Sequence, residues 1–525
     1  MILRAGGWRS VVLGLGLGLF VSRTFAEFAG FPGPSPQPLL LLPVLAGLGV
    51  LLTALASRRN FNLAPLAVLW VYVLFPRIEP GVAAGAAFVG LVAILHKSLA
   101  GRSPAARWGE LLLFTLAFSL YLHTLAPTVL PADGGEFQLV AAVLGIAHPP
   151  GYPLYTLLGK LFTLVPFAEV ATRLNLLSAA AASLTLVLVA RFVRQATGSS
   201  VGGWAAAVAL GASTTFWAQA TTANIRMLTA FFAALMLWLT FTYAHKGRPR
   251  DLALLAAAAG LGVGHHGSLI WMLPPVLAFL WWKQPGFFTH PRSWRQPAAA
   301  LALSFLPLLY IPLRGLTGAP FGSAGITDLP SALDHLLAGG FRGDVLYFAT
   351  PETLPQRLAI LTNALEMQFG GPLLLLALAG GLLLLWQDRP LALLLGGSFG
   401  LVAFIGITYR APQSVEYMLP AYLSLAIAFG YLVGSVARLP GSTLPALASA
   451  TLLFPAATAL ADRFPSYQML ARDRSARGYA DTIIQSAPPG AKVLANWHWA
   501  TPLWYLQQVE GKRPDLEIVY VFPEG

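Results

Sequence analysis

The stretch that decides the fold is residues 108–155, WGELLLFTLAFSLYLHTLAPTVLPADGGEFQLVAAVLGIAHPPGYPLY. Its first part, 108–126, is an apolar run that would extend roughly 28 Å as a helix, close to the roughly 30 Å of a bilayer's hydrocarbon core. Its second part gathers carboxylates, glycines, a histidine and prolines within 30 residues. This pattern is typical of a membrane span that ends in a polar extramembrane segment.

The composition extends this interpretation to the whole chain. Of the 525 residues, 56% are hydrophobic and only 10% are charged, against roughly 45–50% and roughly 25% in soluble proteins. So little charge cannot cover the surface of a soluble domain, which excludes a soluble enzyme with a single anchor. The absence of cysteine excludes disulfides, cysteine-ligated metals and thiol nucleophiles. Carboxylates and histidines are left to carry chemistry.

The remaining apolar runs predict an all-α polytopic membrane protein with about fifteen transmembrane helices. The predicted spans are 11–25, 39–56, 62–75, 81–95, 108–126, 171–190, 201–217, 228–244, 251–263, 268–282, 298–313, 372–387, 391–409, 416–437 and 443–461. The first run, preceded by Arg4 and Arg9, also resembles a signal peptide, and we interpret it as an anchor.

Basic residues collect in alternate connections between these spans, so the net charge of +12 indicates orientation in a membrane and not binding to nucleic acid. With the N-terminus inside, the basic connections are Arg58 and Arg59; Lys97, Arg102 and Arg107; Arg191 and Arg194; Lys246, Arg248 and Arg250; Lys283, Arg292 and Arg295; Arg389; and Arg438. This alternation requires that 137–166 does not cross the bilayer. Its prolines favour short helices at the outer surface.

Three polar regions then share the outer face: 127–170, 314–370 and the tail after about 462. The tail predicts a helix at 474–486, a strand at 492–495, a helix at 501–510 and a strand at 516–521. We therefore divide the chain into an N-terminal group of about four extra spans (1–105), a transmembrane catalytic module (106–462) and a small outer α/β segment (463–525). The second strand ends just before Gly525, which leaves room for a further domain beyond it.

Asp133 and Glu136 form the most informative pair. They lie three residues apart at the start of a helix-forming run, which places both carboxylates near one face. Desolvation and mutual repulsion would separate their pKa values, and such a separation can make one of them a general base. On spacing alone we favour a plainer interpretation, in which Asp133 caps the helix and Glu136 opposes its dipole. Gly134 and Gly135 beside them favour close approach of a ligand.

Histidines join this pair at the predicted outer face. His148 opens the segment HPPGYPLY, in which Tyr152 would lie at headgroup depth, and alone it indicates an interfacial turn. His265 and His266 end the ninth span; neighbouring helical positions point about 100° apart, so we expect one to face a site and the other to pack.

Two arginines also fall at outer span ends. Arg226 (TTANIRMLT) and Arg314 (YIPLRG) could each bind a lipid phosphate bidentately, or could simply extend toward the headgroups.

Several motifs in one order then carry a family resemblance. DGGEF, LGIAHPPGYPLYTLLGKLF, RLNLLSA, GLGVGHH, YIPLRG, APPGAKVLANW and EGKRPDLEIVYV, spread over residues 108 to 525, resemble the multispanning family related to protein O-mannosyltransferases. That family lies within the GT-C glycosyltransferases. Residues 1 to about 105 fall outside the resemblance.

The resemblance implies a GT-C-like fold and an enzyme that transfers a sugar, possibly mannose, from a polyprenyl-phosphate donor to a protein Ser or Thr hydroxyl at the outer leaflet, with inversion. By motif match the essential acid is Asp133, with Glu136 as its partner, and a weak hydroxyl nucleophile needs such a base. For the leaving phosphate the candidates are Arg314, Arg226 and His265 or His266, in that order. His148 and Tyr152 are further binding candidates. The expected location is a bacterial plasma membrane, with the active site and C-terminus outside.

One position departs from the family pattern. Where relatives often show an acidic residue after the seventh span, this chain has Asn224, which can accept a hydrogen bond but carries no charge. The family role of that acid is therefore in doubt. A divalent ion such as Mg²⁺ or Mn²⁺, held by Asp133 or Glu136, stays open as a cofactor, although no dense ligand motif requires one.

Two alternatives stay open. The same donor chemistry could serve a glycolipid or a cell-wall polymer as acceptor. A lipid transporter or flippase is disfavoured, because its ionisable residues should lie near mid-membrane and its halves should repeat.

Overall fold

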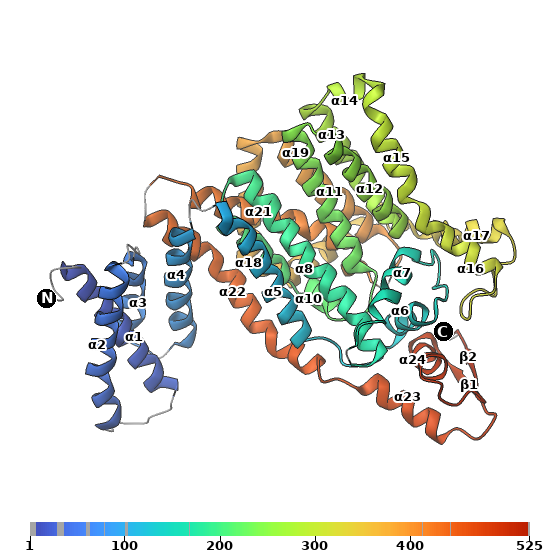
Figure 1. The fold of residues 1–525 in the computed structure, drawn as a ribbon, viewed down its shortest axis with the longest axis horizontal. Coiled ribbons are helices and arrows are strands. Elements are labelled where there is room, and N and C mark those ends of the chain that lie inside the picture. The colour runs from blue at the N-terminus through green and yellow to red at the C-terminus, as the bar shows by residue number, and fades with distance from the viewer. Residues whose placement is uncertain are drawn as a thin grey trace.

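A computed structural model of the chain describes residues 7–28, 36–58, 63–77, 79–99, 103–166, 168–411, 413–440 and 443–522. It is helical almost throughout, and each of the fifteen predicted spans coincides with helical segments (Figure 1). Arg4 and Arg59 lie outside the described residues, as do Arg102 and Gly525.

The chain begins with four helices, which are followed by the predicted span that precedes Asp133 and Glu136. These are α1 (Gly7–Phe28), α2 (Pro36–Arg58), the 3₁₀ helix η2 (Ala64–Val68) with α3 (Leu69–Val73), α4 (Pro80–Leu99) and α5 (Ser103–His123). The polar cluster and the next spans form α6 (Ala132–Val143), α7 (Pro153–Phe162), α8 (Val170–Thr197), α9 (Ser200–Gly211), α10 (Thr214–Ala220), α11 (Arg226–Lys246) and α12 (Pro249–His265).

The second half contains more broken helices. In order they are η3 (Gly267–Met272), α13 (Leu273–Lys283), α14 (Gly286–Thr289), η4 (Pro291–Trp294), α15 (Arg295–Ser304), η5 (Leu306–Leu309), α16 (Tyr310–Leu316), α17 (Leu329–Leu336), η6 (Gly339–Asp344), α18 (Leu354–Gln387), α19 (Arg389–Thr408), α20 (Ser414–Tyr417), α21 (Leu419–Ala437) and α22 (Leu444–Leu470). The tail adds α23 (Ser475–Ser486), β1 (Lys492–Ala495), α24 (Trp497–Gln508) and β2 (Glu517–Tyr520).

Seven helical stretches among the described residues are long and apolar enough to cross a membrane: Val170–Thr197, Arg226–Lys246, Arg295–Leu316, Leu354–Gln387, Arg389–Thr408, Leu419–Ala437 and Leu444–Ser486. Four of the other predicted spans lie in α1, α2, α4 and α5, which have 22, 23, 20 and 21 residues, and the rest form shorter or interrupted helices. Together with the motif resemblance, these helices identify an integral membrane protein, and the all-α polytopic fold class is confirmed.

Two of the predicted outer regions include parts of longer helices. In 314–370, α18 begins at Leu354 and bends at Gly370, whose φ of 69° breaks the helix before Pro372. In the tail after about 462, α22 continues to Leu470. The assignment of both regions to the outer face stays a prediction.

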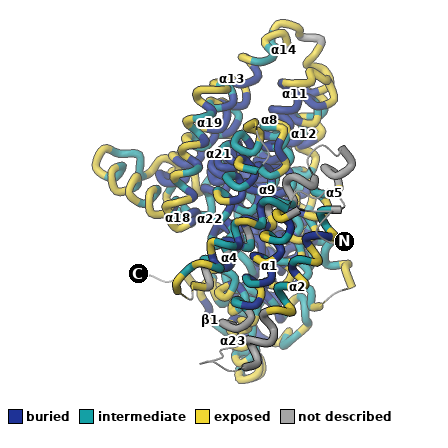
Figure 2. The backbone as a smooth tube through the Cα atoms, turned by 90° about the vertical axis from the view of Figure 1, so that its left-hand side faces the viewer, coloured by how far each residue is buried: buried dark blue, intermediate teal, exposed yellow. Residues whose placement is uncertain are grey.

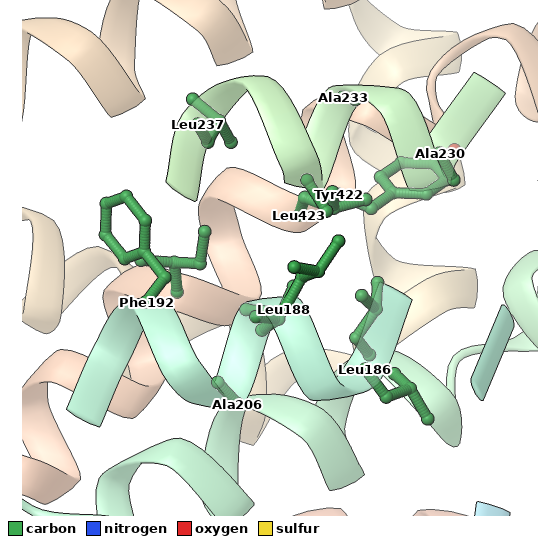
Figure 3. Close-up of a cluster of buried hydrophobic side chains, with 14 of the residues drawn as sticks. Leu186, Leu188, Phe192, Ala206, Ala230, Ala233, Leu237, Tyr422 and Leu423 are labelled. Atoms are coloured by element: carbon green, nitrogen blue, oxygen red, sulfur yellow. The ribbon is translucent and has the colours of Figure 1, made fainter. Parts of the chain in front are cut away.

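The centre of the bundle is built from α8, α9, α11 and α21, and Figure 2 shows buried residues concentrated there. Small residues let these helices approach closely; a Cβ on Gly430 of α21 would lie 2.6 Å from the Gly202 carbonyl oxygen of α9. Leucines and aromatic rings fill the remaining space, together with two alanines of α11 (Figure 3). These side chains are Leu186, Leu188 and Phe192 of α8, Ala230, Ala233 and Leu237 of α11, and Tyr422 and Leu423 of α21. Such close packing makes the bundle a rigid support for the short helices α6 and α7 at one of its ends.

The N-terminal helices pack separately from this centre. Helices α1 and α2 contact each other through Gly14, Gly18 and Gly49, and α4 packs on α22 through Ala93 and Ala450 (Figure 1). The division of the chain at residue 105 stays a prediction.

The segment 137–166 forms two short helices, as expected. With 12 and 10 residues, α6 and α7 extend only about 18 Å and 15 Å, too little to cross roughly 30 Å of hydrocarbon. The tail is also as predicted, since β1 and β2 pair in parallel with Val493 opposite Ile518, and α24 connects them. In Figure 1 this α/β unit lies directly against α6.

Candidate functional site

Asp133 and Glu136 lie on the first two turns of α6. The N-cap of this helix is Pro131, and no side chain caps it. The interpretation that Asp133 serves as the cap is therefore wrong. Its carboxylate Oδ1 instead accepts a hydrogen bond of 2.8 Å from the indole Nε1 of Trp497, at the start of α24.

Glu136 is buried, with 1% of its surface exposed, and both of its oxygens bind His148. The backbone N–H of His148 donates to Oε1 at 2.7 Å, and Nδ1 is in hydrogen-bond contact with Oε2. A buried carboxylate is costly unless it is paired in this way. Glu136 is thus committed to a partner and does not act as a first-turn charge facing solvent.

The pKa of His148 is raised. Burial alone would lower it, but the Glu136 carboxylate and its hydrogen bond favour the imidazolium, and Asp133 adds to this effect. Arg226 acts in the opposite direction. These effects on the pKa indicate that Asp133, Glu136 and Arg226 all lie near the His148 ring.

Gly134 and Gly135 serve helix packing. A Cβ on Gly135 would lie 2.3 Å from the Leu130 carbonyl oxygen and 2.8 Å from Oγ1 of Thr501, on α24. Thr501 itself donates to the Ala132 carbonyl at 2.8 Å. Gly135 thus admits α24 to the surface of α6, whereas Gly134 packs against the Leu130 side chain. The expectation that these glycines favour close approach of a ligand stays a prediction.

Asp133, Glu136 and His148 each place one potential ligand atom within 4.8 Å of the others. Two carboxylates and an imidazole are a plausible donor set for a divalent ion. The Nδ1 of His148, however, is already committed to its hydrogen bond with Glu136. As arranged, the three side chains form a hydrogen-bonded cluster. The two carboxylates keep acceptor capacity for a cation, and so does Nε2 of His148 when the ring is neutral and Nδ1 carries the proton.

Arg226, the first residue of α11, forms a second cluster. Its guanidinium is buried and lies 3.8 Å above the centre of the Tyr417 ring. It donates to Nε2 of His266 at 3.0 Å and to Oε1 of Gln413 at 3.2 Å. Among the residues that the structure describes, it forms no ion pair with a carboxylate. A buried cation held by neutral groups is a favourable site for an anion.

The two adjacent histidines separate as expected. His266 accepts from Arg226 and contacts the Ser268 hydroxyl through Nδ1 at 2.7 Å. His265 is fully buried and donates from Nε2 to the Ile225 carbonyl at 3.0 Å. Tyr152 connects the two clusters, because its ring is stacked on that of His266 and meets the His148 ring edge-on.

Asn224 and Arg314 bind the backbone. Asn224 Oδ1 accepts from the N–H groups of Arg226 and Met227, which caps α11, and Nδ2 donates to the carbonyls of Gln219 and Thr222. Arg314, half-buried on α16, donates from Nε to the Leu144 carbonyl at 3.1 Å and thereby supports the loop that follows α6. Arg226, by contrast, is linked to His148 through His266 and the ring of Tyr152.

The sequence did not point to Trp497, Gln413 or Tyr417. Trp497 lies 364 residues from its partner Asp133, and no local pattern reveals such a contact. Gln413 and Tyr417 follow the predicted span 391–409 at its outer end. The polar side chains of Gln413 and Tyr417, close to the end of a predicted span, were the signals in the sequence that could have pointed to them.

The chain is similar in sequence to known proteins. Residues 133–286 match the family described as the Protein O-mannosyl-transferase TMEM260 N-terminal domain. Mouse Protein O-mannosyl-transferase TMEM260 is 27% identical over 455 residues, which cover 80% of this chain and 63% of the mouse protein. The Dictyostelium discoideum protein O-mannosyl-transferase tmem260 is 37% identical over 81 residues, 15% of this chain and 10% of its own length. The chain thus spans less than two thirds of these relatives.

The fold is similar to that of ArnT from Cupriavidus metallidurans. The structure bound to undecaprenyl phosphate aligns with a TM-score of 0.53 at 12% identity, over 75% of this chain and 84% of ArnT. The apo structure gives 0.52 at 15% identity, over 78% and 89%. The predicted GT-C-like fold and the resemblance to protein O-mannosyltransferases are therefore confirmed.

Proposed function

We propose that the chain is an integral-membrane glycosyltransferase that transfers a sugar from a polyprenyl-phosphate donor to a hydroxyl of an acceptor protein. The observation that carries this proposal is the pairing of an acid cluster, Asp133 with Glu136 and His148, and a buried cation, Arg226, at one end of a GT-C-like bundle. The name of the mouse relative supports mannose as the sugar and a protein as the acceptor. ArnT bound to undecaprenyl phosphate supports a lipid-linked donor.

In this proposal Asp133 is the general base. It takes the proton of a Ser or Thr hydroxyl as the oxygen attacks the anomeric carbon, and the bond from that carbon to the phosphate oxygen breaks on the opposite face. The sugar is transferred with inversion, and the lipid phosphate leaves as an anion. A carboxylate has acceptor capacity for more than one hydrogen bond, so the bond from Trp497 still allows Asp133 to accept from the acceptor hydroxyl.

Arg226 is proposed to bind the leaving phosphate. Its guanidinium is buried and donates to Gln413 and to the His266 ring, and among the described residues it forms no ion pair with a carboxylate. A preorganised cation at the point where negative charge develops lowers the barrier. Arg314, the first choice from sequence, becomes the second, because it supports the loop after α6.

We propose transfer without a resident metal ion. A divalent ion bound to Asp133 and Glu136 would supply further positive charge at the phosphate. Both oxygens of Glu136 already accept from His148, which disfavours a further ligand role for this carboxylate.

We place the site on the outer side of the membrane, as the distribution of basic residues predicts. A bacterial plasma membrane remains the proposed location.

The direct test incubates the purified protein with a panel of polyprenyl-phosphate sugars and an acceptor polypeptide rich in Ser and Thr. We expect transfer of mannose from polyprenyl-phosphate mannose to the polypeptide, detected as an added hexose by mass spectrometry. Transfer only to a glycolipid or cell-wall polymer would assign the alternative acceptor class. Absence of any sugar consumption with every donor would overturn the proposed function.

A further inference from the structure

The small α/β unit at the C-terminal end contributes a side chain to the acid cluster. We propose that Trp497 is a positioning residue, which orients the Asp133 carboxylate through its indole N–H. This inference rests on the proposed function and deepens it, because it makes α24 part of the site. The base would then depend on a residue 364 positions away in the chain.

The geometry of the contact is specific. The indole Nε1 of Trp497 lies 2.8 Å from Oδ1 of Asp133, and an indole nitrogen can only donate. The bond therefore fixes one carboxylate oxygen as its acceptor. A hydrogen bond to an ionised acceptor is roughly twice as strong as a neutral one, so it can hold a half-buried side chain in one rotamer.

The indole is itself held in place by aromatic neighbours. Its ring lies edge-on to those of His148, Trp504 and Tyr520, with centroid distances of 6.3 Å, 6.1 Å and 5.5 Å. Trp497 therefore contacts both the acid cluster and the second strand of the α/β unit.

The α/β unit is fastened to the membrane module close to this contact. Thr501 donates to the Ala132 carbonyl at 2.8 Å, and the Tyr505 hydroxyl accepts from the Ala171 N–H at 2.9 Å. Arg477 pairs with Glu169 at 3.2 Å and with Glu510 at 2.6 Å. These bonds fix α24 relative to α6, which a positioning role requires.

Two substitutions separate hydrogen bonding from packing. Trp497→Phe keeps an aromatic ring and removes the donor. Trp497→His removes bulk, but the imidazole Nε2–H can take the place of the indole N–H in a five-membered ring. A matched control is Trp499→Phe, because Trp499 lies on the same helix and its ring packs on that of Tyr479 in α23, with ring centroids 4.1 Å apart.

The assay uses the full chain with polyprenyl-phosphate mannose and the Ser/Thr-rich polypeptide. We expect Trp497→Phe to lower kcat by about 10-fold to 100-fold with little change in the KM for the donor, as loss of one hydrogen bond to a charged group implies. Trp497→His should recover part of this loss, and Trp499→Phe should stay near the wild type. Near-normal kcat in Trp497→Phe, or lower activity in Trp497→His than in Trp497→Phe, would show that only packing matters and would overturn the inference.

A second measurement does not require turnover. In protein labelled with ¹⁵N-tryptophan, the indole N–H signal of Trp497, assigned by its loss in Trp497→Phe, should shift in Asp133→Asn more than that of Trp504. An unshifted Trp497 signal would overturn the contact itself. If Asp133→Asn retains transfer, the proposed base fails whatever Trp497 does; if only the Trp497 results fail, the proposed function stands without this inference.

Discussion

The acid cluster and the arginine cluster are built in opposite ways. In the first, Asp133 and Glu136 each have a hydrogen-bond donor within the protein, from Trp497 and His148. In the second, the Arg226 guanidinium is buried among His266, Gln413 and Tyr417, and none of these carries a compensating negative charge. The first cluster is internally satisfied, whereas the second would gain most from an external anion.

This difference indicates a division of roles. A base must be held in one orientation before the substrate arrives, so its partners are fixed protein groups. A phosphate site must leave its charge available, so its partners are neutral. The following predictions test that division, from the largest expected effect to the smallest.

Asp133→Asn should lower transfer by about 10²-fold to 10⁴-fold, the usual contribution of a general base. The amide keeps the shape of the side chain and can no longer take the proton. The measurement is initial-rate transfer with a detergent-purified protein. Asp462→Asn, an exposed acid on α22, is the matched control and should leave the rate unchanged. A residual rate within a few-fold of wild type would remove Asp133 from the role of base.

Arg226→Gln should reduce kcat/KM for the polyprenyl-phosphate donor by about 10-fold to 100-fold, because a charge-assisted bond to phosphate is lost. Arg314→Gln is the paired comparison, since Arg314 donates to the Leu144 carbonyl. It should affect donor use less and thermal stability more. If Arg314→Gln lowers kcat/KM for the donor more than Arg226→Gln does, Arg314 and not Arg226 binds the phosphate.

His148→Asn should change the dependence of stability on pH. Because Glu136 raises the pKa of His148 in the folded protein, the stability from this pair is fully present below the ordinary pKa of about 6.5 and is lost as pH rises through the raised pKa. Wild type should therefore lose roughly 2–4 °C in Tm across that interval. The variant should lose less. Parallel curves for the two proteins would show that the pair does not titrate in this way.

Treatment with EDTA followed by gel filtration should alter the transfer rate by less than about two-fold, because both oxygens of Glu136 already accept hydrogen bonds from His148. The check is the rate before and after adding back Mn²⁺ or Mg²⁺. A large loss restored by the ion would show that the acid cluster binds metal during catalysis, which would reverse our description of it as internally satisfied.

The helical bundle was largely predictable because its signals are local. The predicted spans coincide with helical segments, of which seven among the described residues are long and apolar enough to cross a membrane, and turn residues and alternation located the βαβ tail. The start of α18 at Leu354 and the end of α22 at Leu470 were not predicted, because these parts of the helices are less apolar. The site was predictable in its residue types and less so in its pairings: Asp133 was expected to cap α6 and instead binds Trp497.

By itself, the sequence determined that this chain is an integral-membrane helical protein with carboxylates, histidines and arginines at one end of its spans. Hydropathy and residue spacing are properties of stretches of tens of residues, so they can be read from the sequence alone. Only the tertiary structure decided that Glu136 binds His148, that Arg226 is linked to the acid cluster through His266 and Tyr152, and that α24 reaches Asp133. These pairings depend on how the chain turns after α6 and on which helices pack together, and the contact with α24 joins residues 364 positions apart.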